Sequence, residues 1–213
     1  MQRIGLTGGI AAGKSVAAEA FAALGAVLID YDQLSREAVA PGSAGLDAVA
    51  EAFGPTVLGS DGALDRPALA ALVFGGDESA RLRLNRIVHP IVHRLAAERE
   101  AAAATADPDV VVVHDIPLLT ESGRDDSFHL IVVVQADLDL RVRRLVEGRG
   151  LSEPEARGRI AAQTDDAVRA ATADVLLDGN GSPDDLRVQV EQLWGRIVAE
   201  RDAERLAEQE ERE

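Results

Sequence analysis

A glycine-rich loop of eight residues constrains this chain more than any other feature of its sequence. Residues 8–15 read GGIAAGKS and fit the pattern G-x-x-x-x-G-K-[ST] at every position. An apolar run at residues 3–7 precedes the loop, and residues 15–24 read as a helix. In this context the loop N–H groups and the helix N-terminus can cradle a β-phosphate. The strand–loop–helix setting disfavours the alternative, a glycine turn that merely ends in Lys-Ser.

The position of Lys14 strengthens this interpretation. Lys14 is the only lysine, alongside 21 arginines. A compact ammonium can reach the β- and γ-phosphates where a planar guanidinium fits less well, and the Ser15 hydroxyl is placed to ligate Mg²⁺. The loop therefore predicts a nucleoside triphosphate ligand without naming a reaction.

Alternating strands and helices predict the fold class. Apolar runs at residues 26–30, 110–113, 130–134 and 174–177 indicate four more strands, and helices are expected at residues 137–147, 154–171 and 184–208. We expect an α/β P-loop NTPase fold with a parallel five-stranded sheet flanked by helices.

Residues 33 to about 104 instead show one helical pattern after another. Breaks are expected at 41–42, 54–55, 59–62, 75–76 and Pro90. We therefore predict a single P-loop domain over residues 1–213. Its expected parts are a core (about 1–32 and 107–199), a helical insertion (about 33–106), a lid (about 141–170) and a charged tail (about 200–213) that frays into solvent.

Composition excludes some classes of protein. The net charge of −15 and the pI near 4.6 argue against non-specific nucleic-acid binding. The sequence has no 18-residue apolar run for a membrane span and no cysteine, and we expect no leader before its first strand. We expect a cytoplasmic protein that is a monomer or a weak homo-oligomer.

Charged residues that follow the predicted strands are candidates for catalysis. Asp32 follows the second strand and is either a general base for an alcohol or a helix N-cap, while Asp30 fits a structural role better. Asp115 is the last residue of the third strand. Its carboxylate is placed either to lie near Mg²⁺ or to serve in a helix cap or a turn.

Four arginines, Arg141, Arg143, Arg144 and Arg149, accompany the helix after the fourth strand. One or more can neutralise charge on a transferred phosphoryl group, with Gly148 and Gly150 as lid hinges. The alternative, a solvated arginine face, fits Arg141 best.

A series of short motifs follows the loop in order. It comprises residues 30–32 (DYD), 53–54 (FG), 61–66 (DGALDR), 88–90 (VHP), 115–119 (DIPLL), 144–145 (RL), 161–163 (AAQ) and 173–174 (AD). Together with IGLTGGI at residues 4–10, the series resembles the dephospho-coenzyme A kinases from about residue 3 to residue 195.

This resemblance implies ATP-dependent phosphorylation of the ribose 3′-hydroxyl of dephospho-coenzyme A. By analogy Asp32 is the base, and Lys14 and Arg144 stabilise charge. The implied ATP-binding set is Gly9, Ile10, Ala11, Ala12, Gly13, Lys14, Ser15, Val16, Arg149 and Asn180. The implied acceptor-binding set is Asp32, Arg66, His89, Pro117 and Leu118. Ser15 and Asp115 would hold Mg²⁺.

Three positions depart from the family pattern. Val16 replaces a threonine whose hydroxyl can reach the α-phosphate, Thr120 replaces a phenylalanine, and Asn180 stands a few residues away from the usual asparagine. The adenine contacts are therefore the least constrained part of the prediction.

Two other functions remain as alternatives. Another P-loop nucleoside or nucleotide kinase shares the loop, but residues 61–66 and the His89-Pro90 pair argue against it. A GTP-dependent switch commonly needs Asn-Lys-x-Asp to read guanine, and the only lysine lies in the phosphate loop.

Overall fold

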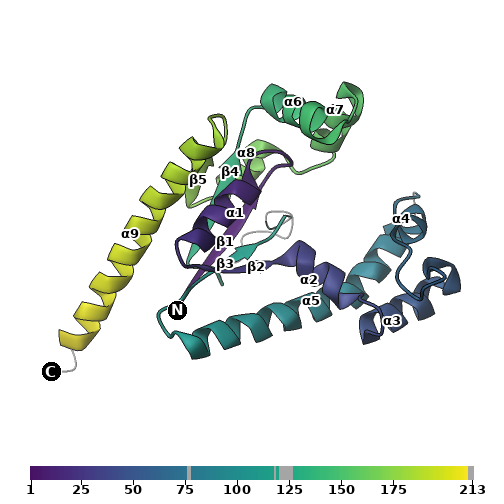
Figure 1. Cartoon of the computed structure of the whole chain (residues 1–213), viewed down its shortest axis with the longest axis horizontal. Coiled ribbons are helices and arrows are strands. Elements are labelled where there is room, and N and C mark those ends of the chain that lie inside the picture. Colours follow the sequence, from purple (N-terminus) through teal and green to yellow (C-terminus); the bar gives the residue numbers. More distant parts are fainter. Residues whose placement is uncertain (76–77, 118, 120–126, 211–213) are drawn as a thin grey trace. The chain divides into compact units, whose positions relative to one another are not determined.

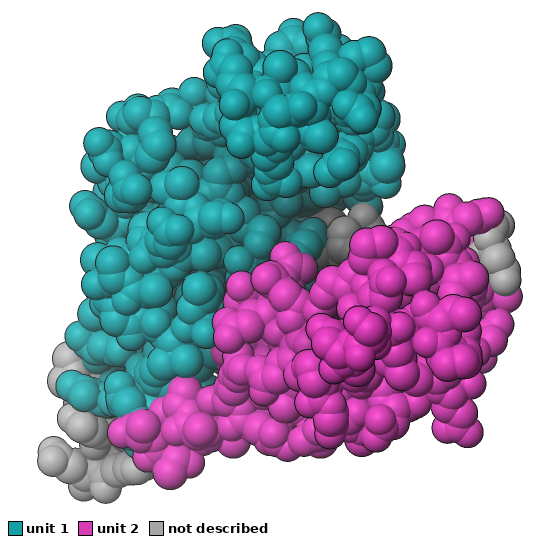
Figure 2. Space-filling view, turned by 45° about the vertical axis from the view of Figure 1, so that its right-hand side comes forward, with its two compact units in different colours: residues 1–28, 107–213 teal, residues 29–106 magenta. Residues whose placement is uncertain are grey.

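The computed structural model describes residues 1–75, 78–117, 119 and 127–210. By its contacts the chain divides into two compact units (Figure 2). The first comprises residues 1–28 and 107–213, and the second comprises residues 29–106.

A parallel five-stranded sheet organises the first unit (Figure 1), as the sequence predicted. The strands are β1 (Gln2–Gly8), β2 (Val27–Asp30), β3 (Val111–Asp115), β4 (Leu130–Gln135) and β5 (Val175–Asp178). Their order is β2-β3-β1-β4-β5, and β1 pairs in parallel with both β3 and β4. Every residue of β3 is buried, as expected of a central strand covered on both faces. The phosphate loop thus follows the central strand of the sheet.

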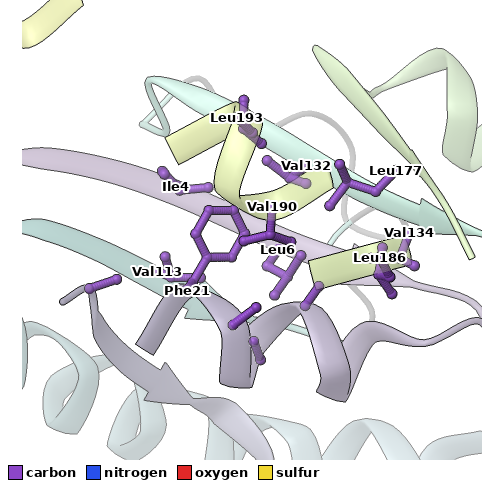
Figure 3. Close-up of a cluster of buried hydrophobic side chains, with 14 of the residues drawn as sticks. Ile4, Leu6, Phe21, Val113, Val132, Val134, Leu177, Leu186, Val190 and Leu193 are labelled. Atoms are coloured by element: carbon purple, nitrogen blue, oxygen red, sulfur yellow. The ribbon is translucent and has the colours of Figure 1, made fainter. Parts of the chain in front are cut away.

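Within the described residues of this unit there are five α-helices. They are α1 (Lys14–Ala23), α6 (Leu138–Arg149), α7 (Glu153–Ala161), α8 (Asp166–Ala171) and α9 (Pro183–Glu210). Side chains of α1 and α9 pack with those of the strands in one hydrophobic core, shown in Figure 3. Phe21 of α1 is fully buried there among Leu6, Val132 and Val190. Each such side chain contributes roughly 1.5–3 kcal/mol on burial, so this core fixes α1 behind the loop.

Two expectations about these helices are wrong. Residues 154–171 form two helices, because Asp165 accepts a hydrogen bond from the Ala167 N–H (2.7 Å) and caps a new helix, α8. The tail does not fray at residue 200, since α9 continues to Glu210. Arg201 donates to the Asp109 carbonyl (3.0 Å) and Arg205 pairs with the Asp109 carboxylate (3.6 Å), which ties this end of α9 to the start of β3.

The second unit is helical and has its own core. Its elements are α2 (Tyr31–Ala38), α3 (Ala44–Phe53), the 3₁₀ helix η1 (Pro55–Val57), α4 (Arg66–Phe74) and α5 (Glu78–Ala106). The predicted break at Pro90 is wrong, because α5 runs through it. Val88 before the proline packs against the core and Val92 after it is buried, so packing on both sides offsets the lost backbone hydrogen bond. Among the described residues, no helix is both long and apolar enough to span a bilayer.

Candidate active site

The phosphate loop joins β1 to α1 and leaves the start of α1 open. Gly13, with φ of 115°, caps α1 without a side-chain hydrogen bond, and no acidic residue lies in the first turn. Among the described residues, none accepts a hydrogen bond from the N–H of Ala11, Gly13, Lys14 or Ser15. An uncapped helix N-terminus with several unpaired N–H groups is suited to an anion.

Two close contacts fix the path of the loop. The Ala12 N–H donates to the Gly9 carbonyl (3.0 Å), which closes a turn, and Ala11 adopts φ of 60°. A side chain on Gly179 would meet the Ala12 carbonyl oxygen at 2.0 Å, so only glycine fits there. The loop therefore packs directly on the segment that follows β5.

Lys14 and Asp115 form an ion pair between the loop and the end of β3. The Lys14 Nζ donates to the Asp115 Oδ1, and the two side chains are 17% and 10% exposed. A mostly buried ammonium needs such a partner, so Asp115 holds Lys14 at the loop. The structure thus brings together two residues that the sequence singled out separately.

The oxygen donors here suit magnesium. Mg²⁺ usually takes one or two protein oxygen ligands and completes its shell with water and phosphate oxygens. The hydroxyl of Ser15, in the first turn of α1, and the carboxylate of Asp115 are donors of that type. No group of three or more His, Cys, Asp or Glu that could hold a metal occurs in the described part of the chain. The donor set therefore fits a nucleotide-bound Mg²⁺ better than a metal held by protein ligands alone.

Arg144 binds backbone carbonyls of the loop and of the segment that follows β5. Its Nη1 donates to the Ala11 and Ala12 carbonyls (3.1 and 3.4 Å), and its Nη2 donates to the Gly179 and Gly181 carbonyls (2.8 and 3.3 Å). The guanidinium thereby places one positive charge beside the loop and joins it to the segment after β5. Its predicted role in stabilising transferred phosphoryl charge stays a prediction.

Arg141 contradicts the sequence interpretation as a solvated arginine. It is 1% exposed, its Nε donates to the Ile10 carbonyl (2.9 Å), and its Nη1 pairs with both oxygens of Asp166 (2.9 and 2.7 Å). A side chain on Gly9 would meet the Arg141 Nη2 at 2.6 Å, so Gly9 makes room for the guanidinium. The reason for the error is that its partners lie more than 20 residues away along the chain.

The remaining residues predicted to contact the nucleotide differ in burial and in hydrogen bonding. Arg143 and Arg149 are exposed, while Val16 packs against the main core. The Asn180 Oδ1 accepts from the Asp137 N–H (2.8 Å). Asn180 also lines a cavity of about 270 Å³, together with residues 135–137 and 176–178 at the ends of β4 and β5. The sequence offered no pattern for this cavity.

Within the second unit, Asp32 lies in the first turn of α2 and is exposed. The N-cap of that helix is Asp30, whose Oδ1 accepts from the Gln33 N–H (2.9 Å), so the cap interpretation of Asp32 is wrong. Its role as a base stays a prediction. Tyr31, the preceding residue, lies edge-on to His93 with ring centroids 6.5 Å apart.

The other predicted acceptor residues that the structure describes lie on two helices and in the turn after β3. Arg66 is the first residue of α4, directly after its N-cap Asp65, and is exposed. His89 is exposed on α5 and lies edge-on to His93 (6.4 Å between centroids). In the first unit, the Pro117 carbonyl accepts from the Thr7 hydroxyl (3.3 Å). Leu118 lies outside the described residues, as does Thr120.

The parallel sheet, the loop and the Lys14–Asp115 pair define a P-loop kinase-type protein. The family model described as dephospho-CoA kinase matches residues 2–185. The chain belongs to the dephospho-CoA kinase family, which confirms the resemblance.

Relatives agree with this assignment. A protein named dephospho-CoA kinase from Mycolicibacterium paratuberculosis is 54% identical over 93% of this chain and 48% of its own length. One from Leifsonia xyli is 48% identical over 92% of this chain and 99% of its own length. The crystal structure of TT1252 from Thermus thermophilus has a TM-score of 0.79 and 34% identity, covering 93% of this chain and 97% of that chain. The chain spans about half the length of the mycobacterial relatives it matches.

Proposed function

We propose that this protein transfers the γ-phosphoryl group of ATP to the ribose 3′-hydroxyl of dephospho-coenzyme A, giving coenzyme A and ADP. The observation that carries the proposal is the match of the dephospho-CoA kinase family over residues 2–185, which includes the phosphate loop. Membership of this family favours dephospho-coenzyme A as the acceptor over the alternative, in which the chain is another nucleoside or nucleotide kinase.

The nucleotide half of the reaction is assigned to the first unit. The unpaired N–H groups of the loop would bind the β-phosphate, and the Lys14 ammonium would reach the β- and γ-phosphates. Asp115 supports this assignment because it holds the ammonium in place before the nucleotide arrives. Arg144 would add positive charge as negative charge develops on the transferred group.

The acceptor half is assigned to Asp32, Arg66, His89, Pro117 and Leu118. The Asp32 carboxylate would accept the proton of the 3′-hydroxyl while that oxygen bonds to the γ-phosphorus. The bond from the γ-phosphorus to its bridging oxygen would break, and ADP would leave. Exposure of Asp32 supports the role, because a base must be reachable by the acceptor.

Magnesium would be held by the Ser15 hydroxyl and the Asp115 carboxylate. It would neutralise charge on the β- and γ-phosphate oxygens. The rest of the proposed ATP-binding set consists of the loop residues 9–16, Arg149, which would close over the nucleotide, and Asn180, which would lie toward the adenine. The cavity beside Asn180 supports that last assignment.

We also propose that the protein acts in the cytoplasm, as a monomer or weak homo-oligomer, without a nucleic-acid partner. The acidic net charge of −15 supports the last point, because phosphate backbones repel such a surface.

A coupled ADP-release assay tests the proposal. Purified protein receives ATP and Mg²⁺ with dephospho-coenzyme A, adenosine or a nucleoside monophosphate as the acceptor. We expect only dephospho-coenzyme A to raise ADP release well above the acceptor-free rate. Stimulation by a nucleoside or a nucleotide alone would move the chain to the alternative function.

A further inference from the structure

The backbone of Ile10 in the phosphate loop is bound by two side chains. Its N–H donates to the Gln163 Oε1 (2.8 Å), and its carbonyl accepts from the Arg141 Nε (2.9 Å). The Arg141 Nη2 also donates to the same Gln163 oxygen (3.3 Å). Both polar groups of one loop residue are therefore occupied by residues 130 or more positions away.

The other backbone N–H groups of the loop differ from that of Ile10 in their hydrogen bonding. In the described part of the chain, the N–H groups of Ala11, Gly13, Lys14 and Ser15 have no protein acceptor. The loop therefore separates N–H groups used for internal bonds from N–H groups open to a ligand. The Ile10 N–H belongs to the first group because Gln163 accepts its hydrogen bond.

Further contacts hold the two binding side chains in place. Arg141 is bound at its Nη1 by Asp166, and Arg169 donates to both Asp166 (2.5 Å) and the Thr164 carbonyl (2.9 Å). Arg141 and Arg169 are 1% and 4% exposed. Buried charge-assisted hydrogen bonds of this kind are stronger than neutral ones, so the segment 163–169 is fixed relative to α6.

Apolar packing joins the same parts. Ile10 and Ala11 pack against a small cluster formed by Val142 and Leu145 of α6 and Ala156 and Ile160 of α7. The loop therefore shares hydrophobic contacts with the two helices that precede Gln163, and displacement of those helices would disturb Ile10.

We propose that Gln163 is a positioning residue for phosphate binding. With Arg141 it holds the Ile10 peptide groups, so that the open N–H groups of the loop are arranged before the nucleotide binds. The proposal deepens the proposed function and rests on it only for the assignment of the loop to ATP. Its effects on the loop and on nucleotide affinity do not depend on the identity of the acceptor.

The test compares four variants of the full chain by hydrogen–deuterium exchange of the Ile10 amide and by calorimetric binding of MgADP. Gln163→Leu keeps the approximate size of the side chain but removes the oxygen that accepts from the Ile10 N–H. Gln163→Glu keeps an accepting oxygen at that position. Asp166→Asn weakens the hold on Arg141 without touching Ile10. Gln189→Leu is the matched control, because Gln189 also bonds to backbone groups, those of Asp178 (2.8 and 2.9 Å).

We expect Ile10 exchange in Gln163→Leu to be about fivefold faster, and MgADP to bind roughly three- to tenfold more weakly. Gln163→Glu should restore both values to within about twofold, and Asp166→Asn should give a smaller increase in exchange. Gln189→Leu should leave Ile10 exchange unchanged.

Three results would overturn the proposal. The first is Ile10 exchange in Gln163→Leu that equals the wild-type rate. The second is an increase in Ile10 exchange in Gln189→Leu as large as that in Gln163→Leu. The third is faster Ile10 exchange in Gln163→Leu without any change in MgADP affinity. If Gln163→Leu does not fold, Asp166→Asn decides, and Ile10 exchange in that variant equal to wild type would overturn the proposal. A wild-type protein that binds MgADP but does not phosphorylate dephospho-coenzyme A would remove the proposed function and leave this inference standing.

Discussion

The phosphate loop and the second unit use charged side chains in opposite ways. Around the loop, Arg141 is 1% exposed and Lys14 17% exposed, and each has a carboxylate partner. In the second unit, Asp32, Arg66 and His89 are all exposed. The charge proposed to meet a triphosphate, Lys14, and the loop-binding Arg141 are thus fixed in advance by buried contacts, which would lower the reorganisation needed during the reaction. The residues proposed to meet an acceptor remain open to solvent.

The variant with the largest expected effect on this contrast is Lys14→Ala. We expect kcat to fall on the order of 10³-fold or more, because the ammonium proposed to reach the β- and γ-phosphates is lost. Lys14→Arg should do nearly as badly, since a planar fork does not replace a point charge. Steady-state ADP release measures both.

A double variant separates catalysis from ion pairing. Lys14→Ala leaves the Asp115 carboxylate mostly buried without its ammonium, at a cost of about 1–3 kcal/mol in the free energy of unfolding. Lys14→Ala with Asp115→Ala should regain stability in urea titrations but not turnover. Recovery of turnover in the double variant would refute the role of Lys14.

Asp32→Asn tests the exposed side of the comparison. We expect kcat to fall roughly 10²- to 10³-fold, because the amide cannot accept the proton, while ATP affinity changes by less than about twofold. Asp30→Asn is the matched control: asparagine caps a helix as well as aspartate does, so its kcat should stay within about twofold of wild type. Near-wild-type kcat in Asp32→Asn would remove the base assignment.

Arg144→Ala asks whether the carbonyl-bound guanidinium also acts in the reaction. We expect kcat to fall roughly 10²-fold and ATP affinity to fall less, because the charge counts most when phosphoryl charge develops. Turnover kinetics and nucleotide titration give the two quantities. Equal losses in both would mean that Arg144 only binds.

Gly9→Ala tests how tightly the loop is held. Its new methyl group would lie 2.6 Å from the Arg141 Nη2, and Arg141 is too buried to move freely. We expect unfolding to become easier by about 1–3 kcal/mol. Gly195→Ala in α9 is the control, since its methyl group meets nothing within 4 Å and should stabilise the helix by about 0.5–1 kcal/mol. Thermal unfolding would contradict the account if the two variants behaved alike.

The smallest effect concerns the cap of α7. Hydrogen bonds from the Ser152 side chain and backbone lower the pKa of Glu155. A lowered pKa in the folded state adds stability above the usual glutamate pKa of about 4.3, and this is lost as the pH falls through the lowered value. The difference in Tm between wild type and Glu155→Gln should therefore be largest near neutral pH and shrink in acid. A difference independent of pH would contradict this.

The fold was largely predictable because its signals are local. Continuous β-branched runs predicted β3 and β4, and the loop string with its flanking pattern predicted β1 and α1. The break before α8 also had a local signal, since Asp165 is a suitable cap. The continuation of α5 through Pro90 had no such signal, because packing on both sides of the proline decides it.

The site was less predictable because its contacts are distant in sequence. Three arginines at positions 141, 143 and 144 look alike in the sequence, yet one is buried, one is exposed and one is partly buried. The partners that distinguish Arg141, namely Gln163 and Asp166, follow it by 22 and 25 residues. The Lys14–Asp115 pair likewise joins residues 101 positions apart.

The central claim is tested most directly by determining which hydroxyl carries the transferred phosphoryl group in the product. ³¹P NMR of a reaction with ATP, Mg²⁺ and dephospho-coenzyme A should show a new ribose 3′-phosphate and an equal amount of ADP. ADP accompanied only by inorganic phosphate, or a phosphate on any other hydroxyl, would contradict the account.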